Sequence, residues 1–150
     1  WVVYQYLNAH YFFEVDVLGK SNKELWGDKL KDSLDTKYDI VIDLNTRDEV
    51  FTQDIVTEQG LIVLGAEKSN GITTRFEKLL WNAVTVVFPS PRQKNFKRCM
   101  EMAVKMIETG ALDIDKFWSK GYDRETEWQD AFKESDYRMP GFNRGYIEWL

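Results

Sequence analysis

The sequence predicts an α/β protein built on a doubly wound parallel sheet. Short apolar runs alternate with segments of helical periodicity, and the connections between them are short. Nearly continuous apolar runs are typical of strands that are buried on both faces, as in a parallel sheet. The expected strands are FEVDVLG (13–19), YDIVIDL (38–44), LIVLGA (61–66), AVTVVF (83–88) and RGYIEWL (144–150).

Apolar residues at spacings of three and four predict the helices between these strands. The expected helical segments are residues 1–12, 20–37, 48–57, 74–81, 92–109 and 125–135. Gln59-Gly60 is expected to end the third of them. The clearest is 92–109, which ends at Gly110. Its apolar stripe is expected to be buried and consists of Phe96, Cys99, Met100, Ala103, Val104 and Ile107.

Composition excludes several classes of protein. The net charge of −5 is spread along the 150 residues without a basic block, which argues against nucleic acid as a partner. No apolar run approaches ~18 residues, so no membrane span is expected. One cysteine, Cys99, and one histidine, His10, cannot form a disulfide or the usual zinc site. These features fit a cytoplasmic protein, and the start at Trp1 suggests a segment of a longer one.

From about residue 38 onward, the order of motifs resembles the medium-chain dehydrogenase/reductase family. YDIVIDL is similar to its fourth Rossmann strand, EQGLIVLGA to its fifth and AVTVVFPSPR to its sixth. The segments after them resemble its long helix with a glycine stop, a short helix and a closing strand; they are KRCMEMAVKMIETGALDIDKFWSKGYD, WQDAFKES and RGYIEWL. The resemblance implies a Rossmann-like fold that binds a nicotinamide dinucleotide.

The sequence departs from this family at its start. The G-x-G-x-x-G turn, which brings backbone N–H groups to the pyrophosphate, is absent, and so is the first strand. Either the upstream sequence is missing or the alignment of residues 1–19 is wrong, and we favour the first explanation. Residues 1–109 would then be a partial dinucleotide-binding domain. Residues 110–150 would be a C-terminal tail that returns to a missing catalytic domain.

The resemblance implies a set of cofactor-binding residues at strand ends. Gly19, Lys20 and Ser21 follow the second Rossmann strand, where a basic or hydroxyl residue accepts the 2′-phosphate of NADP. This favours NADP, with NAD as the alternative, although Lys20 also fits a solvated loop. The residues expected near the nicotinamide or its ribose are Leu44, Asn45 and Thr46, then Leu64, Gly65 and Ala66, then Phe88, Pro89 and Ser90.

Each of these positions also has a purely structural interpretation. Asn45-Thr46 would serve equally as a helix cap, and Gly65 and Pro89 as turn residues. Arg144 resembles a late basic residue of the family that reaches the pyrophosphate, but it also fits an exposed surface arginine. His10 fits a packed histidine and Cys99 a small buried hydrophobe.

No catalytic residue is expected in this chain, because in the family catalysis comes from the N-terminal domain. That domain would supply any zinc. The reaction would be hydride transfer between the cofactor and an alcohol, polyol or sugar(-phosphate), or the corresponding carbonyl.

Two other functions remain open. An S-adenosylmethionine-dependent methyltransferase is also doubly wound, but it should end in an antiparallel hairpin. A non-catalytic Rossmann scaffold would explain the missing glycines. Family members usually pair through the sheet edge near the sixth strand, so a homodimer through 83–88 is expected.

Overall fold

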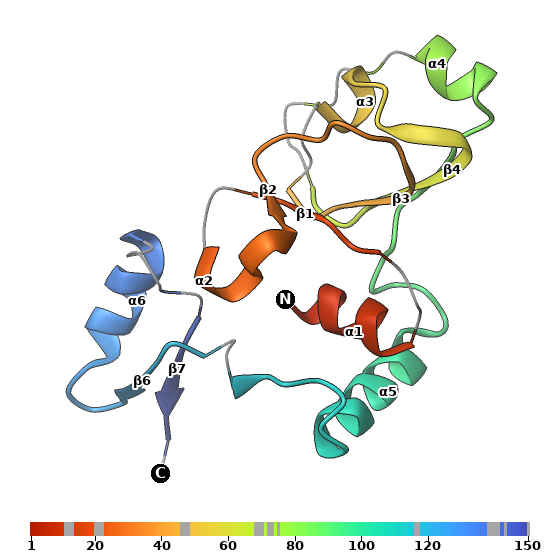
Figure 1. Cartoon of the computed structure of the whole chain (residues 1–150). Coiled ribbons are helices and arrows are strands. Elements are labelled where there is room, and N and C mark those ends of the chain that lie inside the picture. The colour runs from red at the N-terminus through yellow and green to blue at the C-terminus, as the bar shows by residue number, and fades with distance from the viewer. Residues whose placement is uncertain are drawn as a thin grey trace. The chain divides into compact units, whose positions relative to one another are not determined.

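The computed structural model describes most of the chain (Figure 1). The described residues are 1–10, 14–19, 23–45, 49–67, 71, 74, 76–115, 118–137, 142 and 144–149. They group into two compact units, one formed by Trp1–Leu30 with Lys97–Leu150 and the other by Lys31–Phe96. The division at 109/110 expected from the sequence concerns a longer enzyme and stays a prediction.

The unit Lys31–Phe96 is built on three parallel strands in the order β3-β4-β5. These strands are β3 (Tyr38–Asp43), β4 (Val56–Leu64) and β5 (Thr85–Val87). Helix α3 (Glu49–Thr52) lies in the connection from β3 to β4, and α4 (Phe76–Trp81) in the connection from β4 to β5. The expected parallel α/β arrangement is therefore confirmed for this part of the chain.

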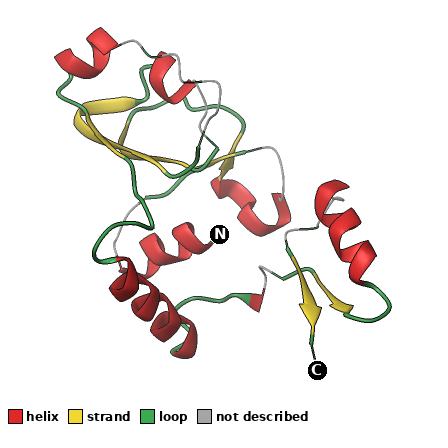
Figure 2. Ribbon diagram, turned by 180° about the vertical axis from the view of Figure 1, so that it is seen from behind, coloured by secondary structure: helices red, strands yellow, loops and turns green. Residues whose placement is uncertain are grey.

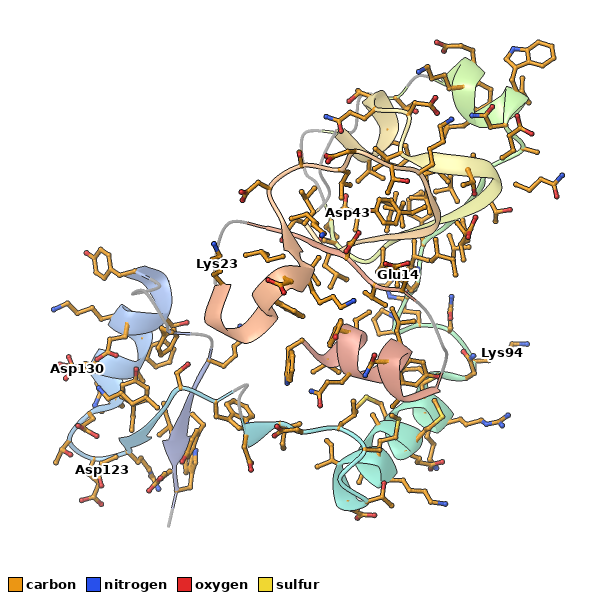
Figure 3. The ribbon with its side chains drawn as sticks, viewed as in Figure 1. Glu14, Lys23, Asp43, Lys94, Asp123 and Asp130 are labelled. Atoms are coloured by element: carbon orange, nitrogen blue, oxygen red, sulfur yellow. The ribbon has the colours of Figure 1, made fainter. Side chains whose placement is uncertain are left out.

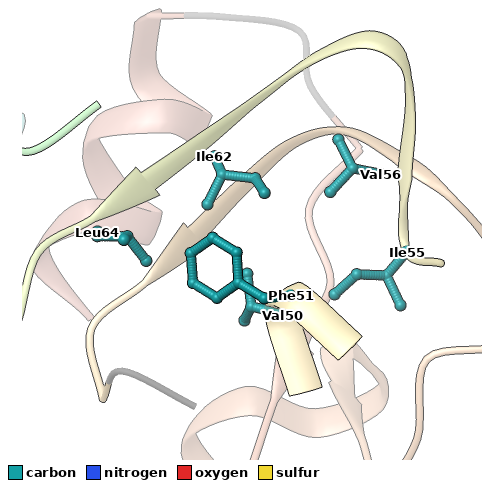
Figure 4. Packing of buried hydrophobic residues seen from close by; sticks show 6 residues of the cluster. All are labelled: Val50, Phe51, Ile55, Val56, Ile62 and Leu64. Carbon is teal, nitrogen blue, oxygen red and sulfur yellow. The ribbon is translucent and has the colours of Figure 1, made fainter. Parts of the chain in front are cut away.

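The core of this unit gathers around β4 (Figure 4). Ile62 is fully buried, because β4 pairs with β3 on one side and β5 on the other. Val50 and Phe51 from α3 face Ile62 and Leu64 across the cluster. Burying side chains of this size stabilises the unit by about 1.5–3 kcal/mol each.

Strand β4 contains an irregularity between its two regular stretches. Tyr38 pairs with Val56 and Ile40 pairs with Leu61, so residues 57–60 lie opposite Asp39 alone. Gln59 has a φ of 59°, and its amide donates to the Asn82 carbonyl at 2.7 Å. The irregularity thus ties β4 to the turn before β5.

The unit of Trp1–Leu30 and Lys97–Leu150 is mostly helical and has two small sheets (Figure 2). Strand β1 pairs with β2, and β6 pairs in parallel with β7. The elements are α1 (Val2–His10), β1 (Val17–Leu18), α2 (Lys23–Trp26), η1 (Gly27–Lys29), β2 (Leu30–Lys31), α5 (Phe96–Glu108), β6 (Lys120–Asp123), α6 (Trp128–Tyr137) and β7 (Gly145–Glu148).

The side chains of Trp1 and of Gln5 in α1 hold the segment that follows α5. The Gln5 side chain donates to the Asp113 carbonyl and accepts from the Asp113 amide, each at 2.7 Å. The Trp1 indole N–H donates to the same carbonyl at 3.1 Å. The Trp1 ring also stacks with Tyr4 and meets Trp26 edge-on. Together these contacts join two segments that are far apart in the sequence.

Several local expectations were wrong. The helix expected over 48–57 is the short α3, and Gln59-Gly60 lies inside β4 because strand pairing overrides the helix-stop pattern. Of the segment 20–37, the described residues 23–37 contain α2, the 3-10 helix η1 and β2 instead of one helix. Strand β3 is not buried on both faces, since Ile40 is 40% exposed.

The apolar stripe of α5 was also predicted incorrectly. Met106 is the buried residue of this helix, and its carbonyl accepts the amide of the buried Leu112. Cys99 is exposed, as are Phe96, Met100, Val104 and Ile107, whereas Ala103 is half-buried. The helix itself and its stop at Gly110, with φ of 72°, agree with the prediction.

Replacement of Gly60 tests the irregularity in β4. A Cβ at this position would lie 2.5 Å from Val56 Cγ1 and 2.9 Å from the Thr57 carbonyl oxygen. Gly60→Ala is therefore expected to lower the free energy of unfolding by about 1–3 kcal/mol, measured by urea denaturation with circular dichroism. Glu58→Ala, at an exposed position of the same strand, is the control. Equal stability of the two variants would contradict the packing described for β4.

Candidate functional site

The carboxyl ends of the three parallel strands meet at one edge of the sheet. Asp43, the last residue of β3, pairs in register with Leu64, the last residue of β4. The Gly65 amide continues this ladder by donating to the Asp43 carbonyl at 2.8 Å. Val63 pairs with Val87, so Phe88 follows at the end of β5. Ligands of open α/β sheets bind outside such carboxyl ends.

Asp43 organises the end of β3 (Figure 3). It is buried, and its carboxylate accepts the Asn45 amide at 2.8 Å. The bond closes an Asx-type turn. Leu44, the residue between the two, is 54% exposed. A Cβ on Gly65 would lie 2.8 Å from Leu44 Cδ2, so a larger residue here would displace the exposed Leu44 side chain.

The other strand ends differ in what they expose. The Leu64 side chain belongs to the core, so any contact from this residue to a ligand would use its backbone. Ala66 is half-buried, and Phe88 is 66% exposed. Pro89 and Ser90 are exposed, and the Ser90 hydroxyl accepts the Arg92 amide at 3.2 Å. A turn after β5 therefore accounts for these two residues without a ligand.

The structure brings together some of the residues predicted from the sequence. The ones at the common edge of the sheet are Leu44, Asn45, Leu64, Gly65, Ala66, Phe88 and Pro89. Lys20, Ser21 and Thr46 lie outside the described residues. Gly19 and Arg144 belong to the other unit. Gly19 packs near Leu30, and Arg144 is exposed, with its carbonyl accepting the Ser119 amide at 2.8 Å.

The strand ends expose apolar side chains and offer few free backbone donors. Leu44 and Phe88 are the large apolar side chains exposed there. The amides of Asn45 and Gly65 are already used within the protein. Hydrogen bonds from this edge to a cofactor would therefore come from carbonyl oxygens or from the exposed Asn45 side chain.

A second polar cluster was missed in the sequence. The Glu134 carboxylate of α6 accepts from the Lys120 ammonium and from the Tyr122 hydroxyl, each at 2.9 Å. These hydrogen bonds lower the pKa of Glu134 and raise that of Lys120. The pKa of the fully buried Tyr122 is raised, first by its burial. The signal was the alternation of Lys120 and Tyr122, which places both side chains on one face of a strand.

Asp123 organises the turn that leads from β6 into α6 (Figure 3). Its carboxylate accepts from the Thr126 hydroxyl and from the amides of Glu125 and Thr126, each at 2.8 Å. These bonds lower the pKa of Asp123. Glu127 in turn accepts the Asp123 amide at 3.0 Å. The arrangement is a reciprocal cap and has a structural role.

Two kinds of feature are absent from the part of the chain that the structure describes. No group of three or more His, Cys, Asp or Glu side chains in this part of the chain could hold a metal ion. No helix there is long and apolar enough to cross a membrane.

The fold is similar to that of a known dehydrogenase. A short chain alcohol dehydrogenase from E. coli CFT073, solved in complex with the cofactor NADH, superposes with a TM-score of 0.76 at 13% sequence identity. The match covers 94% of this chain and 46% of that one, so this chain spans about half the length of its structural neighbour. No protein-family model and no curated protein matches the sequence. The likeness confirms the Rossmann-like α/β fold class, while the medium-chain subdivision remains a prediction.

The Glu134 cluster has a pH signature. In the folded protein the pKa of Glu134 lies below its ordinary value of 4.5. The stabilisation that its ionised carboxylate provides is therefore complete above pH 4.5 and is lost as the pH falls through the folded pKa. We expect the urea midpoint of the native chain to fall more steeply below pH 5 than that of Glu134→Gln, which should be less stable at pH 7. Glu108→Gln, on the exposed surface of α5, is the control. Parallel pH profiles for the native chain and Glu134→Gln would contradict this role.

Proposed function

We propose that this chain is the cofactor-binding portion of an NAD(P)-dependent oxidoreductase. The substrate class would be an alcohol, polyol or sugar(-phosphate), and the reaction hydride transfer. One observation carries the proposal: three parallel strands end at a common edge that exposes Leu44 and Phe88. The fold around that edge is similar to one that binds NADH in an alcohol dehydrogenase.

In this proposal, the strand ends hold the nicotinamide half of the cofactor. Leu44 and Phe88 would cover the ring, the Asn45 side chain and the backbone of Leu64–Ala66 would bond its polar groups, and Pro89 would shape the turn beside it. Gly19, Lys20 and Ser21 would bind the adenosine ribose, with a preference for NADP over NAD through Lys20. Arg144 would reach the pyrophosphate. The bound cofactor supplies the hydride chemistry, and these residues bind and orient it.

We assign no catalytic residue within residues 1–150. Substrate binding, and zinc if the enzyme uses it, would come from a further domain of a medium-chain enzyme. We place this enzyme in the cytoplasm, because the chain holds one cysteine and no expected span. The methyltransferase alternative is disfavoured, since β6 and β7 pair in parallel and not as an antiparallel hairpin.

Cofactor titrations test the proposal. We expect NADPH to quench tryptophan fluorescence at lower concentrations than NADH, and S-adenosylmethionine to have no effect. Lys20→Ala should weaken NADPH binding by roughly tenfold or more, because a charged hydrogen bond to phosphate is lost, while NADH binding should change little.

Lys29→Ala is the matched control, since Lys29 is an exposed lysine of the same segment. Binding of S-adenosylmethionine alone would overturn the proposal in favour of a methyltransferase. Binding of no nucleotide by the intact protein would favour a non-catalytic scaffold.

The proposed homodimer forms through residues 83–88. Strand β5 is one of the two outer strands of the described three-stranded sheet, and Val87 and Phe88 are exposed there. A charge on such an edge opposes strand pairing. Val87→Lys is therefore expected to convert a dimer to a monomer at micromolar concentrations, measured by light scattering after gel filtration. An intact native protein that is already monomeric under these conditions contradicts the dimer.

A further inference from the structure

The two faces of the β6–β7 sheet have different surroundings. Tyr146 pairs with Gly121 and Ile147 with Tyr122, so Tyr146 and Gly121 share the face opposite to Tyr122. Helix α6 covers the Tyr122 face, where the Tyr122 hydroxyl donates to Glu134 (Figure 2). The face of Tyr146 and Gly121 carries an open pocket of about 520 Å³.

Two aromatic rings form adjoining walls of this pocket. The Trp118 and Tyr146 rings lie 5.7 Å apart between centroids, at an interplanar angle of 77°. Both line the pocket, with exposed fractions of 41% and 44%. At this angle the edge of one ring lies against the face of the other. An open ring face carries partial negative charge, which favours a positively charged guest.

Carboxylates lie beside the rings. Asp115 lines the pocket, and Glu148 approaches its wall at Gly121. A Cβ at Gly121 would lie 2.8 Å from Glu148 Oε1 and 2.9 Å from the Tyr146 hydroxyl oxygen. Glycine at this position therefore lets the Glu148 carboxylate and the Tyr146 ring close over the strand.

The ammonium group of the lysine that lines the pocket lies near Glu134 and Tyr122. Lys120 is the single cation among the described lining residues, and its ammonium lies 2.9 Å from Glu134 and 4.5 Å from the centroid of Tyr122. Both partners belong to the face covered by α6. Among the described lining residues, Asp115 is therefore the charged group left beside the two rings, and Glu148 adds a second carboxylate at Gly121.

We propose that the pocket formed by Trp118, Tyr146 and Asp115 binds an organic ammonium cation. The rings supply cation–π attraction, and the carboxylates of Asp115 and Glu148 complement the charge. The volume accommodates a group of the size of trimethylammonium with its substituent. The same chain already places Arg124 over Trp149, with the guanidinium carbon 4.3 Å from the ring centroid. This site is separate from the proposed cofactor edge and does not depend on it.

Choline and its neutral isostere, 3,3-dimethylbutan-1-ol, test the proposal with the full chain. Saturation-transfer NMR should detect choline with a dissociation constant of about 0.1–10 mM, and the isostere should bind roughly five- to thirtyfold more weakly. Binding of choline should weaken as salt concentration rises. Equal binding of both probes, or binding of neither, overturns the proposal.

Variants locate the binding. Trp118→Leu should weaken choline binding at least about fivefold, because one aromatic wall is lost. Glu148→Gln preserves the shape of the side chain and should weaken choline binding and reduce its salt dependence. Trp128→Leu is the control, since Trp128 is a similarly exposed tryptophan of α6. An effect of Trp128→Leu equal to that of Trp118→Leu, or none from Glu148→Gln, places the cation elsewhere and overturns the proposal.

Discussion

The position of β4 between two parallel partners is the constraint on which the described sheet depends. Its neighbours pair with residues 61–63 on both sides, so Ile62 is removed from solvent completely. Slipping the register by one residue would bring the side chains of Leu61 and Val63 to the core in place of Ile62. Because the registers on both sides are fixed, the ends of β3, β4 and β5 come to one edge. The proposed cofactor site is a consequence of this alignment.

The irregularity at residues 57–60 allows this alignment and the start of β4 to coexist. Val56 pairs with Tyr38 and contributes to the core, and the chain must then absorb the extra residues before Leu61. Gly60 fits because its missing side chain leaves room for Val56, and Gln59 turns its amide toward Asn82. The same segment therefore sets the position of β4 and anchors the approach to β5.

The sequence predicted the strands at 38–44, 61–66 and 83–88 because each is a nearly continuous apolar run between polar segments. It could not predict the irregularity, since Gln59-Gly60 has the pattern of a helix end. Its place in β4 depends on its position opposite Asp39 and on the bond from the Gln59 amide to the Asn82 carbonyl. The apolar periodicity of α5 predicted the helix correctly but its buried face incorrectly. Burial depends on where the rest of the chain packs, and the residue that is buried is Met106, whose carbonyl bonds to the segment after the helix. At the candidate site, the sequence placed Leu44 and Gly65 at strand ends, but their close approach to each other is visible only in space. The Glu134 cluster joins residues 12 and 14 positions apart, a spacing that no local pattern reports.

The most direct test of the account is hydrogen–deuterium exchange with and without saturating NADPH. The strand ends at 43–45, 64–66 and 88–90 come from separate parts of the sequence, so a ligand that covers the common edge would protect all three together. We predict slower exchange in these three segments, with α6 (Trp128–Tyr137) unchanged. Saturation without protection of these segments, or with protection confined to the β6–β7 region, would contradict the assignment of the cofactor site to this edge.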